Sequence, residues 1–246
     1  DIDENTSFSI HRNKELLSNI SKERISSEFS MLVTGVNYYN IMKGYRDVIE
    51  VFIPQVGKIS EEDWDNILNS MNFAYGVTLR LALILYKTGN SENILKNLKY
   101  DGKTIKSVKV MERYSDEKIL PGRISIKRQL NLIGYGNYVD LINFRIAVFM
   151  GQQGKHEQEL DNIKEAEAIL KDIIINKECY NLSMLAVNGE DLMNAGIKKG
   201  AVLGTVLNGL LNLVIEEKLE NNKETLIDYV RKAKNYNYDN ASVLQG

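Results

Sequence analysis

The sequence is poor in the residues that build disulfide frameworks and metal centres. Its 246 residues include one cysteine, Cys179, and two histidines, His11 and His156. A single cysteine excludes a disulfide within the chain. Because no histidine lies near it in sequence to activate the thiol, we interpret Cys179 as a small buried apolar side chain. Two histidines near opposite ends of the chain exclude a metal site built from several histidines, and we predict no metal ligand.

Proline is scarce as well, with two residues, and long apolar runs are missing. Apolar residues recur at three- and four-residue steps over long segments, which is the spacing of one helix face. We therefore predict an all-α fold, an elongated array of helices in two to three small helical subdomains. No apolar run approaches the roughly 18 residues of a membrane span, and no secretory segment is evident. We expect a cytoplasmic protein without a membrane partner.

Known catalytic motifs are missing too. The sequence has no G-x-x-x-x-G-K-[ST] loop and no strand followed by G-x-G-x-x-G. It also lacks an Asp-x-Asp on a strand that could hold two magnesium ions. The acidic runs Glu61–Asp63 and Glu216–Glu217 fit helix ends or exposed surface better than general acids. We therefore predict no catalytic residue and no cofactor within these residues.

Charge is unevenly distributed along the chain. The formal net charge is only −2, which argues against a generic nucleic-acid binder. However, residues 87–128 hold eleven basic and five acidic residues, whereas residues 157–228 hold seven lysines and fourteen acids. A basic middle segment indicates an anionic partner or, alternatively, a solvated lysine-rich helix face.

Helix boundaries can be predicted from caps and breakers. Ser21 is expected to begin a helix after a break at residues 19–21, and Ser60 is expected to cap the helix that carries Trp64. A cap of the form Asn221-x-x-Glu224 should precede the last helix. Further helices are predicted over residues 37–52, 74–87, 137–150, 157–176 and 201–217.

The segment Val187–Asn208 carries the clearest functional signal. It predicts a short helix over Glu190–Ala195, a hairpin bounded by Gly196 and Gly200, and a longer apolar helix that starts there. The free backbone N–H groups and the positive dipole of a helix start form a ready anion site. Two lysines, Lys198 and Lys199, lie in the hairpin beside it. We predict a phosphate contact at this point. An alternative is that the glycines only let two helices pack closely, and we prefer that interpretation for Gly204.

Read in order, several segments resemble the C-terminal two-thirds of bacterial CCA-adding enzymes, the tRNA nucleotidyltransferases related to poly(A) polymerases. The resemblance covers nearly the whole chain and is most specific near its end. The matching segments are Asn13–Phe29, Tyr45–Pro54, Leu79–Lys87, Ser125–Leu130, Leu185–Leu192 with the glycines at 196, 200 and 204, and Leu219–Leu226. It implies a neck remnant over residues 1–54, a body over residues 55–152 and a tail over residues 153–246.

Two departures from the family pattern bear on activity. The polymerase head, with its acidic metal ligands, and the nucleotide-reading Glu-Asp-x-x-Arg motif would precede Asp1 and do not occur in these residues. We expect the chain to be a fragment that is inactive alone, with Mg²⁺ required by the missing N-terminal head. Where many relatives carry the His-Asp of a phosphohydrolase, this chain has Tyr86-Lys87. We expect this degenerate region to be structural.

The resemblance also implies a function. The family adds C, C and A to tRNA 3′ ends from CTP and ATP, and its body and tail grip the acceptor stem and T-loop side of tRNA. Helical RNA is held mainly through phosphates and 2′-hydroxyls, which suits basic helix faces and helix N-termini. The predicted RNA-binding residues are Lys198, Lys199 and Gly200 in the hairpin, and Arg123, Lys127 and Arg128 in the basic middle. For Lys127 and Arg128 a plain surface role is an equal alternative.

Two other functions stay open at the level of sequence. A hairpin of the form Gly-x-x-x-Gly between two helices also suits a helix-hairpin-helix module that binds duplex DNA. A helical protein-interaction domain without a nucleic-acid partner is compatible with the acidic tail. Competition between tRNA and duplex DNA distinguishes these alternatives.

Overall fold

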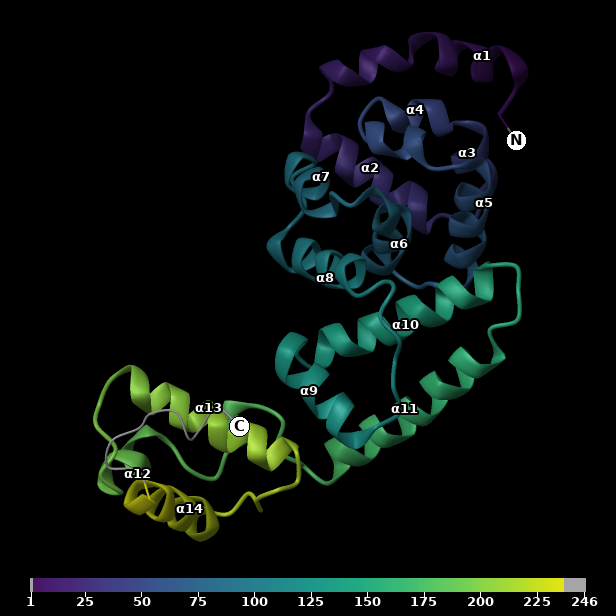
Figure 1. Cartoon of the computed structure of the whole chain (residues 1–246). Coiled ribbons are helices and arrows are strands. Elements are labelled where there is room, and N and C mark those ends of the chain that lie inside the picture. The colour runs from purple at the N-terminus through teal and green to yellow at the C-terminus, as the bar shows by residue number, and fades with distance from the viewer. Residues whose placement is uncertain (1, 237–246) are drawn as a thin grey trace. The chain divides into compact units, whose positions relative to one another are not determined.

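The computed structural model describes residues 2–236, and the predicted all-α fold is confirmed there, with no strand in that range (Figure 1). The α-helices are, in chain order, α1 (Glu4–Asn13), α2 (Lys22–Thr34), α3 (Tyr38–Gly44), α4 (Arg46–Glu50), α5 (Glu61–Ser70), α6 (Val77–Leu85), α7 (Ser91–Asn97), α8 (Gly102–Arg113), α9 (Arg123–Ile133), α10 (Tyr135–Gly151), α11 (Glu157–Ile175), α12 (Gly189–Asn194), α13 (Ala201–Ile215) and α14 (Lys223–Tyr236). Short 3-10 turns connect several of them.

The chain divides into two compact units, which we describe separately. Unit 1 comprises residues 1–119 and 135–163, and unit 2 comprises residues 120–134 and 164–246. Helices of the predicted neck and body pack together in unit 1, where α2 contacts α6. The division into residues 1–54, 55–152 and 153–246 stays a prediction, and residues 237–246 of the expected tail lie outside the described part.

The core of unit 1 forms around α6. All five residues from Leu81 to Leu85 have no exposed surface, because this part of α6 carries only apolar side chains and is enclosed by α2, α5, α8 and α10. Trp64 and Leu68 of α5 and Phe144 of α10 are also buried. Helix α10 contacts α5, α6 and α8, so its 17 residues connect the layers of this unit.

Helix caps in unit 1 follow the sequence closely. The Ser21 side chain accepts a hydrogen bond from Arg24 N, and the Ser60 side chain accepts one from Asp63 N, which confirms both predicted N-caps. The single helix predicted over residues 37–52 is wrong, because the chain breaks at Tyr45 (φ −118°, ψ 31°) into α3 and α4. The Tyr45 ring stacks on His11, and its hydroxyl donates to Ser7 Oγ over 2.9 Å.

Unit 2 packs α12, α13 and α14 around a small apolar core. Cys179 is buried in that core, which confirms its predicted role, and burial raises the pKa of its thiol. The predicted cap at Asn221 is wrong: Thr225 N donates to Asn222 Oδ1 instead. The Asn221 amide accepts from Ala186 N and donates to Met184 O, so it fastens the chain before α12 to the chain before α14.

The close approach of α10 to α5 predicts a stability effect. A Cβ placed on Gly151 would lie 2.2–2.4 Å from the Oγ, N and Cα atoms of Ser70, and the backbone atoms cannot move aside without shifting α5. We expect Gly151→Ala to lower the free energy of unfolding by about 1–3 kcal/mol or more. Chemical denaturation measures it.

Gly136→Ala in the same helix is the matched control. A Cβ at Gly136 meets nothing within 4 Å, so alanine there should leave stability unchanged or raise it by up to about 1 kcal/mol. Equal unfolding midpoints for the two variants would contradict the proposed contact between α10 and α5.

Candidate nucleic-acid interface

The short helix α12 is capped at both ends by residues that lie next to it in the sequence. At its start the Asn188 side chain accepts from Glu190 N and Asp191 N, while the Asp191 side chain accepts from Asn188 N, forming a capping box. At its end Gly196 has φ +91° and Ile197 N donates to Leu192 O, the long bond of a Schellman turn. Ile197 also packs on the apolar core of unit 2. The hairpin is thus held by backbone bonds and one apolar contact.

Helix α13 begins without a side-chain cap. Its N-cap residue, Gly200, has φ +134°, a conformation that favours glycine, and no side chain bonds to the first turn. This start therefore presents N–H groups and a positive dipole end, as predicted. The interpretation of Gly204 as a close-packing residue is wrong, because a Cβ there would meet nothing within 4 Å. Close approach occurs at Gly189, whose Cβ would lie 2.9 Å from Leu203.

Lys198 and Lys199 are both exposed between the two helices. Neither forms an ion pair with any residue in the range 2–236. In a unit rich in carboxylates, two unpaired ammonium groups beside an uncapped helix start make a small positive surface. We call Lys198, Lys199 and Gly200 the hairpin site. These three predicted residues are consecutive in the chain, and the structure leaves all three exposed.

The basic residues of α9 are in a different environment. The Arg123 guanidinium pairs with both Asp172 and Glu178. Its hydrogen bond to Asp172 raises the pKa of Arg123 and lowers that of the Asp172 carboxyl. Lys127 is 5% exposed, and its Nζ lies 2.6 Å from Glu178 Oε2 and 3.2 Å from Glu217 Oε1. The Lys127 ammonium is enclosed by carboxylates, so it offers no open position to a phosphate.

Arg128 lies at the outer side of the same arrangement. Its guanidinium is 2.5 Å from Glu216 Oε1, and its side chain is 61% exposed. A hydrogen bond from Lys218 lowers the pKa of the Glu216 carboxyl, and a smaller effect in the same direction comes from the hydrogen bond with Arg128. We call Arg123, Lys127, Arg128 and their four carboxylates the α9 ion-pair cluster. Much of the basic charge around residue 125 is therefore neutralised by acids of the same unit.

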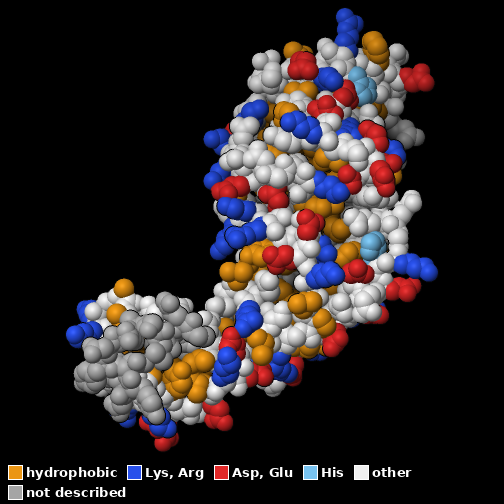
Figure 2. All heavy atoms as spheres, in the orientation of Figure 1, with side chains coloured by type: hydrophobic (Ala, Val, Ile, Leu, Met, Phe, Trp, Pro, Cys, Tyr) orange, Lys and Arg blue, Asp and Glu red, His pale blue; other side chains and the backbone are white. Residues whose placement is uncertain are grey.

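A further group of cations lies in the basic middle segment but was not among the predicted RNA-binding residues. Lys and Arg side chains gather along the part of unit 1 formed by α7 and α8, with acidic side chains among them (Figure 2). Lys96 and Lys109 pair with Glu92. Lys103 and Lys106 are exposed one turn apart on α8 and have no ion pair in residues 2–236. Their three-residue spacing, which places them on one helix face, is the signal that could have made them candidate RNA contacts.

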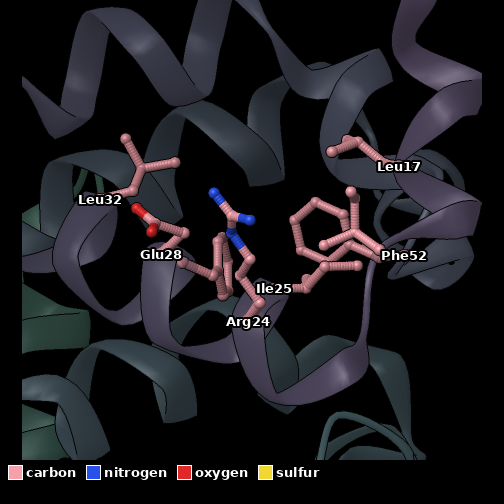
Figure 3. A pocket seen from close by; sticks show the side chains of 8 residues that line it. Leu17, Arg24, Ile25, Glu28, Leu32 and Phe52 are labelled. Atoms are coloured by element: carbon pink, nitrogen blue, oxygen red, sulfur yellow. The ribbon is translucent and has the colours of Figure 1, made fainter.

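An apolar cavity of about 480 Å³ lies against α2 in unit 1. Figure 3 shows Arg24 and Glu28, one turn apart on α2, beside Leu17, Ile25, Leu32 and Phe52. Six of its eight lining residues are aliphatic or aromatic, and only Arg24 and Glu28 are charged. Its walls therefore offer few hydrogen-bond donors to a phosphate. Nothing in the sequence pattern marked this cavity.

The residues that replace the phosphohydrolase motif have structural contacts. Lys87 pairs with Asp63, and burial raises the pKa of Tyr86 to about 12. The Tyr86 ring packs edge-on against Phe144. Among the described residues no three His, Cys, Asp or Glu side chains gather as a metal site. No helix in the described range is long and apolar enough to cross a membrane.

The enclosed position of Lys127 predicts a structural role. We expect Lys127→Met to lower the free energy of unfolding by about 1–3 kcal/mol, because Glu178 and Glu217 each lose a charged partner. Urea titration measures it, with Lys171→Met, an exposed lysine of α11, as the control. Unchanged stability with weakened RNA binding would instead favour a direct RNA contact.

Comparison with known proteins finds similarity to tRNA nucleotidyltransferases over nearly the whole chain. A profile described as tRNA nucleotidyltransferase domain 2 matches residues 77–230, and one described as "Probable RNA and SrmB-binding site of polymerase A" matches residues 1–56. The CCA-adding enzyme of Streptococcus mutans is 24% identical over 245 residues, covering 94% of this chain and 56% of the relative. The crystal structure of the Bacillus stearothermophilus CCA-adding enzyme in complex with CTP matches with a TM-score of 0.71 at 18% identity, covering 95% of this chain and 57% of that one. The chain spans a little over half the length of each.

Proposed function

The chain belongs to the tRNA nucleotidyltransferase family, and we propose that it serves as the tRNA-binding, non-catalytic C-terminal portion of a CCA-adding enzyme. In this proposal it holds the acceptor stem and T-loop side of tRNA while the 3′ end grows. Nucleotidyl transfer from CTP and ATP, with Mg²⁺, belongs to an N-terminal head. We therefore expect these 246 residues alone to incorporate no nucleotide.

The observation that carries the proposal is the hairpin site. Lys198 and Lys199 are exposed and unpaired within the described residues, and they directly precede the uncapped start of the 15-residue helix α13. Lysines and helix N-termini contact the phosphates of helical RNA without reading its bases. A non-specific grip of this kind suits a protein that must hold many different tRNAs.

Among the other predicted residues, Arg128 remains a candidate because its side chain is largely exposed. Arg123 and Lys127 are held by two carboxylates each, so we expect their contribution to RNA binding to be indirect. Lys103 and Lys106 on α8 are additional candidates for phosphate contacts.

The hairpin site is tested by the salt dependence of tRNA binding. We expect the double variant Lys198→Glu/Lys199→Glu to bind tRNA more weakly and to lower the slope of log K against log salt by about two, one for each lost phosphate contact. Fluorescence anisotropy with labelled tRNA at several salt concentrations measures both quantities.

Lys171→Glu/Lys232→Glu is the matched control. Both lysines are exposed in the same unit and have no ion pair in the described range, so the change in net charge is equal. A control that weakens binding as much as the hairpin variant would remove the hairpin site from the interface. Preferential binding of duplex DNA would instead support a helix-hairpin-helix module, and no tRNA shift at low salt would favour a protein-interaction domain.

A further inference from the structure

A buried arginine in unit 1 lacks a counter-charge. Arg145, on α10, is 9% exposed, its buried Nε has no hydrogen-bond partner, and no ion pair joins its guanidinium to another residue in the described range. The guanidinium lies over the Phe149 ring, 4.5 Å from its centroid. Burial lowers the pKa of Arg145, while Asp116 and Glu159 act on it only from beyond ion-pair distance. A cation–π contact compensates only part of the cost of burying a charge.

The Arg145 side chain lines a small cavity. Its volume is about 90 Å³, room for a few water molecules or one phosphate-sized group, but not for a nucleotide. Lys118 lies at its exposed rim, and Phe149 forms part of its wall.

The cavity also lies at a helix N-terminus. Gln158 and Glu159 belong to the first turn of the 19-residue helix α11, where backbone N–H groups and the positive dipole end favour an anion. Gln158 Nε2 donates to Asn162 Oδ1 over 3.1 Å, which leaves the Asn162 NH₂ group as a further donor at the wall. The cavity therefore combines a buried guanidinium, a lysine, amide donors and a helix start.

We propose that this cavity binds a single phosphate group, with the Arg145 guanidinium as its anchor. Glu159 also lines the cavity, and its negative charge repels a fully ionised anion. A phosphate that still carries a proton can donate its P–OH hydrogen to that carboxylate, whereas sulfate near neutral pH has no proton to donate. The site therefore takes free phosphate or the terminal phosphate of a monoester in preference to sulfate. It is separate from the hairpin site and does not rest on the tRNA proposal.

Calorimetric titration with defined anions tests the proposal. At pH 6 and constant ionic strength, the parent chain should bind inorganic phosphate saturably and sulfate at least tenfold more weakly. Ribose 5-phosphate distinguishes the two sources: binding equal to that of phosphate indicates a monoester site, and weaker binding indicates a free-phosphate site. The proposal is overturned if neither phosphate compound binds saturably, or if sulfate binds as tightly as phosphate.

Arg145→Gln should weaken phosphate binding at least tenfold, whereas Arg12→Gln, which removes one exposed positive charge from α1, should leave it unchanged. Retained affinity in Arg145→Gln would overturn the proposal. If circular dichroism shows that Arg145→Gln does not fold, Lys118→Gln at the exposed rim decides: affinity that falls several-fold supports the site, and unchanged affinity overturns it. Because the titrations contain no RNA, their failure would leave the tRNA proposal standing.

Discussion

The α9 ion-pair cluster is the constraint on which unit 2 depends. Helix α9 lies far in sequence from the rest of this unit, which continues only at residue 164. Arg123, Lys127 and Arg128 attach it to carboxylates 49 to 90 residues further along the chain. Lys127 is the centre of the cluster because it is buried and shares Glu178 with Arg123. A buried charge with two carboxylate partners is costly to separate, so the cluster fixes α9 in place.

The cluster also explains the uneven charge along the sequence. The basic middle and the acidic tail partly neutralise each other inside unit 2. Cations that form such ion pairs differ from those that remain exposed and unpaired in the described residues, such as Lys198 and Lys199. Arg145 is a third kind, buried but unpaired. A count of lysines and arginines along the sequence treats these three kinds of cation alike, although their capacity to bind a phosphate differs greatly.

Local features were predictable from the sequence because they depend on neighbouring residues. The caps at Ser21 and Ser60 and the short helix before Gly196 rest on contacts within one turn. The errors involve partners distant in sequence: Asn221 bonds to Met184 and Ala186 instead of capping the next residues. The acids that enclose Lys127 lie at positions 178 and 217, and no local pattern relates them to α9. Similarly, the Arg145 cavity brings Lys118 and Ile119 beside residues of α10 and α11 that lie further along the chain.

In the hairpin before α13, the residues that determine the backbone conformation differ from those that carry the charge. Its conformation comes from the capping box at Asn188, the Schellman turn at Gly196 and the glycine at position 200, while Lys198 and Lys199 contribute no bond to it. Substitutions at the two lysines are therefore nearly free of folding constraints. Evolution can adjust the strength of this surface toward a polyanion one residue at a time, without the loss of stability that usually accompanies a change at a functional site.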